Sequence, residues 1–248
     1  MVALRMLVPA LLLSLPLCAQ AADGFYKDLF MDGGKALSGY KKLHAADMMG
    51  LTYDVLATTD KVTQNAVMVS SPDDLNGALL YPDGAPRYRV IYVNGGGPAP
   101  HGASLGKAGR QRIKDFVAHG GAYTGSCAGA FFAMLHFSRT KYKKEGAKET
   151  YLHLWPGIAR TALTFDETAD LVFDKPYHPL VKKYPSLADG KVENLYHSGG
   201  CRLDNTYYPL PKGTELIGRN HAPKLKALHG YHNILAYKKD NKTGRLVL

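Results

Sequence analysis

The residues with the clearest chemical potential surround Cys127, in the segment Gly125-Ser126-Cys127-Ala128-Gly129-Ala130. Apolar residues precede and follow this segment, which predicts a strand, a tight turn and a helix. Small residues on both sides of one reactive side chain are typical of a nucleophile elbow, where neighbouring backbones come close. The N-terminus of the following helix favours the thiolate, the nucleophilic form of cysteine. The alternative is a structural cysteine, because free cysteine is often a small apolar core residue.

A glycine-rich segment, Gly95-Gly96-Gly97, follows the clearest strand of the sequence, residues 89–93. Such a loop can bring free backbone N–H groups near a nucleophile. We expect the N–H groups of Gly96 and Ala128 to form an oxyanion hole beside Cys127. The alternative is a plain turn between a strand and a helix.

His197 is the internal histidine that we expect to act as the base, because it ends a predicted strand beside the Gly199-Gly200 turn. Site residues gather at such strand ends in parallel sheets. A surface histidine is the alternative, and His178 is a weaker candidate. Tyr196 is expected to be a pocket residue or a rim aromatic. We expect these residues to contact the substrate: Gly95, Gly97, Ser198 and Gly199.

Neither a cofactor nor a metal ion is expected. The glycines depart from the G-x-G-x-x-G pattern of dinucleotide sites, and Pro98 and Pro100 interrupt the helix start that such a site needs. His229 and His232 have an H-x-x-H spacing, but no cluster of Cys, Asp or Glu completes a metal site.

Strand and helix signals alternate along the first half of the chain, which predicts a parallel sheet with crossover helices. Strand-like pieces between Pro- and Gly-rich turns follow in the second half. We expect helices over 36–49 and 105–119, and strands over 53–57, 66–69, 89–93, 122–124, 152–162, 169–173, 192–197, 216–218, 234–237 and 245–248. No repeat or linker divides the chain, so one domain is expected.

The order of these segments resembles the class I glutamine amidotransferase-like superfamily, and most closely the biotin–protein ligase N-terminal domain family within it. The strand and glycine loop at 90–97, the elbow at 123–130, and the segments 154–160 and 195–200 carry the resemblance. The resemblance implies a flavodoxin-like, doubly wound, mostly parallel α/β sheet with flanking helices and a nucleophile elbow at Cys127. The resemblance also implies that the N–H groups of Gly96 and Ala128 donate hydrogen bonds to the oxyanion. It does not imply ligase activity.

One feature departs from the superfamily pattern. There the catalytic histidine follows a late strand, usually before a glutamate, whereas here the matching strands end at Leu248. The base is therefore expected beyond Leu248 or elsewhere in the chain, or the protein does not catalyse.

Residues 1–21 are predicted to be a secretory signal peptide, because one Arg precedes an apolar run and Ala19-Gln20-Ala21 resembles a cleavage site. The mature domain is then 22–248, secreted or periplasmic. No second apolar run is long enough to span a membrane. Cys127 and Cys201 remain after cleavage, and in an oxidising compartment a disulfide between them is the rival to a free nucleophile.

The formal net charge of +10 is spread along the chain and fits a solvated basic surface, with no nucleic-acid motif.

From the elbow and the resemblance we expect a cysteine-nucleophile hydrolase or amidotransferase-like protein that acts on an amide or acyl bond of a small-molecule or peptide-like substrate. The alternative is a non-catalytic envelope protein that keeps the fold and binds a ligand. Substrate and oligomeric state do not follow from the sequence.

Overall fold

The computed structural model describes residues 27, 29–32, 44–57, 66–69, 78–138, 147–162, 164–203 and 209–248. The predicted signal peptide and most of the helix predicted over 36–49 lie outside these residues. The described helices are α1 (His44–Met48), α2 (Pro98–Ala118) and α3 (Ala128–Ala133), with a 3₁₀ turn at Pro185–Leu187. The described strands are β1 (Leu29–Asp32), β2 (Tyr53–Ala57), β3 (Ala66–Met68), β4 (Val90–Val93), β5 (Ala122–Gly125), β6 (His136–Ser138), β7 (Ile158–Thr161), β8 (Glu167–Phe173), β9 (Lys191–His197), β10 (Cys201–Arg202), β11 (Thr214–His221), β12 (His232–Tyr237) and β13 (Leu246–Val247).

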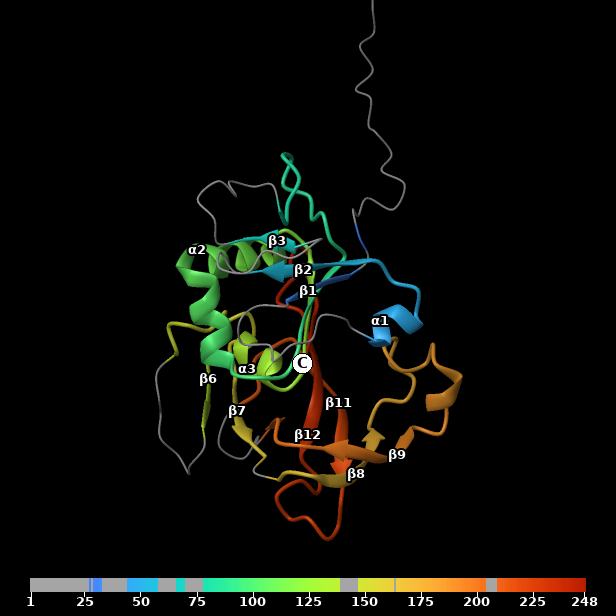
Figure 1. Ribbon diagram of the computed structural model, residues 1–248. Helices are drawn as coiled ribbons and strands as arrows, with labels where there is room; N and C mark the ends of the chain where they lie inside the picture. Colours follow the sequence, from blue (N-terminus) through green and yellow to red (C-terminus); the bar gives the residue numbers. More distant parts are fainter. Residues whose placement is uncertain are drawn as a thin grey trace, which may run out of the picture.

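Within the described residues, ten strands form one sheet in the order β3-β2-β1-β4-β5-β13-β12-β11-β8-β9. The neighbours from β3 to β13 pair in parallel, and the pairs from β13 to β9 are antiparallel. The two parts lie at opposite ends of the molecule, with the blue-to-green strands at the top of Figure 1 and the orange-to-red strands at the bottom. The predicted fold class, a mostly parallel α/β core with an elbow, is confirmed.

The parallel part is stable because its strands and helices bury apolar side chains against one another. Ile91 and Val93 of β4 and Tyr123 of β5 are fully buried, and Leu105 and Phe116 of α2 belong to the same core. Buried and half-buried positions alternate along β4, so one face of this strand is fully covered and the other is partly covered.

The helix α2 begins at Pro98, earlier than the predicted start at residue 105. The expectation that the prolines interrupt this helix start was wrong, because proline fits the first turn of a helix, where its missing N–H has no helical partner. The helix is kinked at Gly106, whose φ of 64° and ψ of −178° are not helical.

The antiparallel part confirms the strands predicted near 169–173, 192–197, 216–218 and 234–237, and the final hairpin of β12 and β13. The strand predicted over 152–162 forms only at Ile158–Thr161. Leu152 and Trp155 before it donate backbone N–H groups to the carbonyls of Phe132 and Ala133, which hold this segment against α3 instead of a strand.

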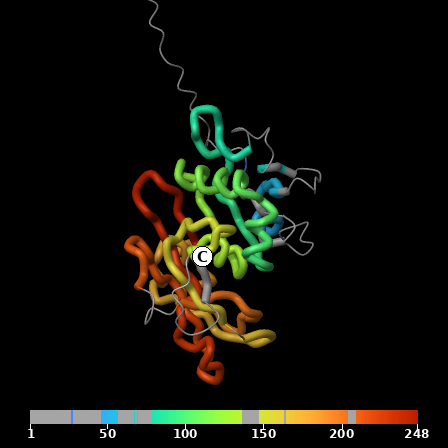
Figure 2. Tube along the Cα trace, turned by 90° about the vertical axis from the view of Figure 1, so that its left-hand side faces the viewer, coloured from blue at the N-terminus to red at the C-terminus, as the bar shows by residue number. Residues whose placement is uncertain are grey.

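Within the described residues a second, smaller sheet pairs β10, β7 and β6. In Figure 1 and Figure 2 the C-terminus lies in the middle of the molecule, between the parallel and antiparallel parts. Among the described residues, no helix combines the length and apolar character that a membrane span requires.

Candidate active site

Cys127 lies in the turn between β5 and α3, with φ of 51° and ψ of −110°. A positive φ is rare for a residue with a side chain and stores strain in the backbone. This conformation turns the cysteine out of the strand and helix that flank it, which is the geometry of a nucleophile elbow. The elbow that the sequence predicted is therefore present at Cys127.

Two glycines make this turn sterically accessible. A Cβ atom on Gly125 would lie 2.5 Å from the carbonyl carbon and oxygen of Gly129, and a Cβ atom on Gly129 would lie 2.1 Å from the carbonyl oxygen of Val93. Real Cβ atoms do not approach backbone atoms this closely, so both positions need glycine. The buried hydroxyl of Tyr123 donates to the Gly129 carbonyl over 2.7 Å and fixes the start of α3.

The turn is anchored to the end of β4 by backbone hydrogen bonds. Ser126 donates its N–H to Val93 over 2.9 Å, and Gly129 donates to Asn94 over 3.1 Å. Among the described residues, the N–H groups of Gly96 and Ala128 donate to no backbone carbonyl.

Gly95 lies against Cys127. A Cβ atom at Gly95 would lie 3.4 Å from the Cβ atom and 3.7 Å from the Sγ atom of Cys127, which is ordinary van der Waals contact. The glycine loop after β4 thus reaches the sulfur, as the sequence predicted for a loop one crossover before the elbow.

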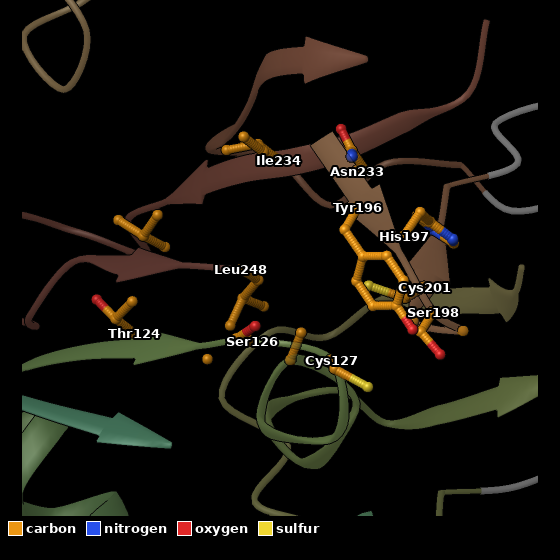
Figure 3. A pocket seen from close by; sticks show the side chains of 15 residues that line it. Thr124, Ser126, Cys127, Tyr196, His197, Ser198, Cys201, Asn233, Ile234 and Leu248 are labelled. Atoms are coloured by element: carbon orange, nitrogen blue, oxygen red, sulfur yellow. The ribbon is translucent and has the colours of Figure 1, made fainter. Parts of the chain in front are cut away.

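A cavity of about 420 Å³ opens beside Cys127. Figure 3 shows Cys127 on the α3 side of this cavity, with Tyr196, His197 and Cys201 on the side of β9 and β10. The cavity is lined by Thr124, Gly125, Ser126, Cys127, Ala130, Tyr196, His197, Ser198, Gly199, Gly200, Cys201, Asn233, Ile234, Val247 and Leu248. The structure therefore brings together the predicted nucleophile, the predicted base and two predicted substrate contacts, Ser198 and Gly199.

His197 is the histidine of this cavity. Its Nδ1 atom is buried and has no hydrogen-bond partner among the described residues. Burial lowers the pKa of His197 from its ordinary value of 6.5, and a backbone hydrogen bond at Thr164 opposes this shift. The imidazole is therefore neutral at pH 7 and able to accept a proton.

The two cysteines share the cavity, and both are free thiols in this structure. Burial raises the pKa of the Cys201 thiol to about 12, and the charge of Cys127 acts in the same direction. Cys201 is thus held protonated at neutral pH, although it lies in the same pocket as the proposed nucleophile.

The other predicted site residues lie elsewhere. Gly95, Gly96, Gly97 and Ala128 are not among the cavity-lining residues, and Gly97 is the N-cap of α2. His178 is buried outside the cavity, where its Nδ1 atom accepts the Leu180 N–H over 3.2 Å and its Nε2 atom lies 3.6 Å from Glu215.

The H-x-x-H pair also has structural partners. His229 Nδ1 accepts the backbone N–H of Ala222 over 3.2 Å, and His232 Nε2 lies 2.7 Å from the Asp174 carboxylate. In the described part of the chain no group of three His, Cys, Asp or Glu side chains is placed to hold a metal ion.

Several cavity residues were missed by the sequence reasoning, among them Cys201, Asn233 and Leu248. Leu248 follows β13, which pairs with β5, and Asn233 lies in the next strand, β12, whereas Cys201 begins β10 of the smaller sheet. The sequence contains the strands but not their order, so no local signal identified these residues.

One family model matches the part of the chain that contains the glycine loop and the elbow. Residues 85–168 match the model described as biotin-protein ligase, N terminal. This match runs from just before β4 through the elbow to the first residues of β8 and confirms the predicted resemblance over these residues. A protein of Chlamydia muridarum described only as uncharacterized is 42% identical over 50 residues, which are 20% of this chain and 19% of that protein.

Solved structures with a similar arrangement were also found. A glutamine amidotransferase has a TM-score of 0.49 at 13% identity, with 88% of this chain and 87% of that chain covered. A cytoplasmic protein of Salmonella typhimurium also has a TM-score of 0.49 at 13% identity, with 89% and 85% covered. A ThuA-like protein of Bacteroides uniformis has a TM-score of 0.45 at 15% identity, with 93% and 84% covered.

Proposed function

We propose that this protein is a secreted cysteine-dependent hydrolase or amidotransferase-like protein that acts on an amide or related acyl bond. The observation that supports this most is the strained turn at Cys127, which opens into a cavity that His197 also lines. A nucleophile on a tight turn beside free backbone N–H groups suits attack on a carbonyl carbon.

The proposed reaction has two steps. The Cys127 thiolate attacks the carbonyl carbon, and the N–H groups of Gly96 and Ala128 hold the negative oxygen of the tetrahedral intermediate. His197 takes the thiol proton and returns it to the leaving amine, which departs as the carbonyl re-forms. Water then attacks the acyl-cysteine with His197 as the base, and the acid product and the thiol are released.

The proposal is tested by forming the acyl-enzyme on Cys127. Purified protein is mixed with 4-nitrophenyl acetate, nitrophenol release is followed, and the acetylated residue is located by mass spectrometry. We expect acetyl transfer to Cys127 with loss of turnover in Cys127→Ser, whereas Cys201→Ser is the matched control and retains the activity. Equal nitrophenol release by the wild type and Cys127→Ser would refute the proposal.

One observation favours a second candidate, a non-catalytic ligand-binding protein. A catalytic base is usually oriented by a third polar group, often a carboxylate. Among the described residues that line the cavity there is no Asp or Glu, and His197 Nδ1 is unpartnered. If this second function is correct, the protein binds a ligand in the cavity and Cys127→Ser does not change the affinity.

Secretion is part of the proposal and has its own test. We expect protein recovered from the host envelope to begin at residue 22, because residues 1–21 have the charge, apolar run and small residues of a cleavable signal. N-terminal mass spectrometry measures this directly, and an intact Met1 would refute it.

A further inference from the structure

Two large aromatic side chains are exposed at the rim of the Cys127 cavity. The exposed fractions are 61% for Phe165 and 69% for Tyr196. Tyr196 lines the cavity, and Phe165 lies against the cavity residue Gly199, where an added Cβ atom would be 3.1 Å from the ring. Exposed aromatic rings beside a cavity are typical of ligand contacts, because their burial on binding is favourable.

The segments that carry these rings are fixed by hydrogen bonds. Gly199 donates its backbone N–H to Thr164 over 2.7 Å, which ties the turn after β9 to the loop before β8. The Tyr196 hydroxyl donates to the Asp166 carboxylate, and this hydrogen bond raises the pKa of Tyr196. The rings therefore stand on a preformed surface, which reduces the entropy cost of binding.

We propose that Phe165 and Tyr196 form a subsite that binds an aromatic or large apolar side group of a peptide-like substrate, next to the carbonyl that reacts with Cys127. This inference rests on the proposed function and adds the substrate class. Figure 3 shows Tyr196 on the same side of the cavity as His197, across from Cys127.

The polar groups beside the rings favour an apolar ligand over a sugar. A sugar ring needs hydrogen bonds to its hydroxyl groups as well as stacking on aromatic rings. The Asp166 carboxylate is already bonded to the Tyr196 hydroxyl, and Ser198 also bonds to this hydroxyl. These two polar groups are therefore already engaged with Tyr196, and the exposed ring faces of Phe165 and Tyr196 are the apolar surface beside them.

The subsite is tested with three alkylating reagents on the full chain, in a Cys18→Ser and Cys201→Ser background so that Cys127 is the one thiol that is followed. Iodoacetamide, N-benzyl iodoacetamide and a glucosyl iodoacetamide all react in the same way: the Cys127 thiolate attacks the CH₂ carbon and iodide leaves. Intact-mass kinetics give the rate ratio of each substituted reagent to iodoacetamide. We expect the benzyl ratio to fall about 2- to 12-fold in Phe165→Ala and in Tyr196→Ala, the range of one aromatic contact.

Tyr177→Ala is the matched control. Tyr177 is 88% exposed and is not a cavity residue, so its removal should leave the benzyl ratio unchanged. Thermal unfolding of each variant shows that the fold is retained, as expected for exposed side chains. A benzyl ratio that is equal in all variants, or a preference for the glucosyl reagent, overturns the subsite and leaves the nucleophile intact. Failure of Cys127 to react with any reagent overturns the proposed nucleophile and the subsite together.

Discussion

Cys201 is the thiol of the cavity whose ionisation burial suppresses. Burial raises the pKa of Cys201 to about 12, so almost none of it is thiolate at neutral pH. We predict that iodoacetamide modifies Cys127 much faster than Cys201 at pH 7.5, measured by peptide mass spectrometry at short reaction times. Comparable rates at the two cysteines, or a disulfide between them in the isolated protein, would contradict this prediction.

His197 gives the protein a pH dependence that does not rely on activity. Burial lowers its pKa in the folded state from the ordinary value of 6.5, which applies to the unfolded chain. Below that pH the unfolded chain binds a proton that the folded protein does not. The free energy of unfolding therefore decreases as the pH falls from 6.5 towards the lowered pKa, and levels off below it.

We predict that wild-type protein loses more stability than His197→Gln between pH 7.5 and pH 5. Urea unfolding measures, for each protein, the change in the free energy of unfolding between pH 7.5 and pH 5. Subtracting the change of His197→Gln from that of the wild type cancels the contribution of the other titrating groups. The same pH dependence in both proteins would show that His197 titrates normally in the folded state.

At the scale of the element, the elbow depends on the contact between β4 and the first turn of α3. Gly129→Ala would place a Cβ atom 2.1 Å from the Val93 carbonyl oxygen, so the helix or strand must move. We predict a loss of about 1–3 kcal/mol in the free energy of unfolding, the usual range for overpacking, measured by urea unfolding.

Gly95→Ala is the matched variant on the other side of the same cysteine. Its Cβ atom would make only ordinary contact with Cys127, at 3.7 Å from Sγ, and its backbone has no positive φ. This variant should keep the wild-type stability and react more slowly with bulky thiol reagents. If Gly95→Ala were as unstable as Gly129→Ala, the close packing would not be specific to the elbow.

At the scale of the whole molecule, β13 joins the two parts of the main sheet. It pairs in parallel with β5 and antiparallel with β12, and Leu246 within it is 2% exposed and belongs to the main core. We predict that Leu246→Ala costs about 2–5 kcal/mol in the free energy of unfolding, as for other buried leucines.

Chemical denaturation measures this loss in the free energy of unfolding, with one spectroscopic probe in the parallel part of the main sheet and one in the antiparallel part. Leu195→Ala is the control because Leu195 is 42% exposed. A cost near zero for Leu246→Ala would mean that β13 does not contribute to the core.

The sequence by itself determined the local structure around Cys127. Small residues at 125, 126, 128 and 129 permit a tight turn, and the apolar runs on both sides specify the strand and helix. The strand 89–93, its glycine loop and the final hairpin followed in the same way from turn residues and hydrophobic pattern. These features depend on neighbours in the chain, so the residues themselves carry the information.

Only the tertiary structure decided which distant residues meet at the cavity. The sheet order places β13 beside β5, and β12 beside β13, which brings Asn233 and Leu248 to Cys127. The same folding places His197 and Cys201 opposite the elbow and leaves His178, His229 and His232 outside the cavity. Strand order is set by the burial of many side chains at once, and no single stretch of sequence records it.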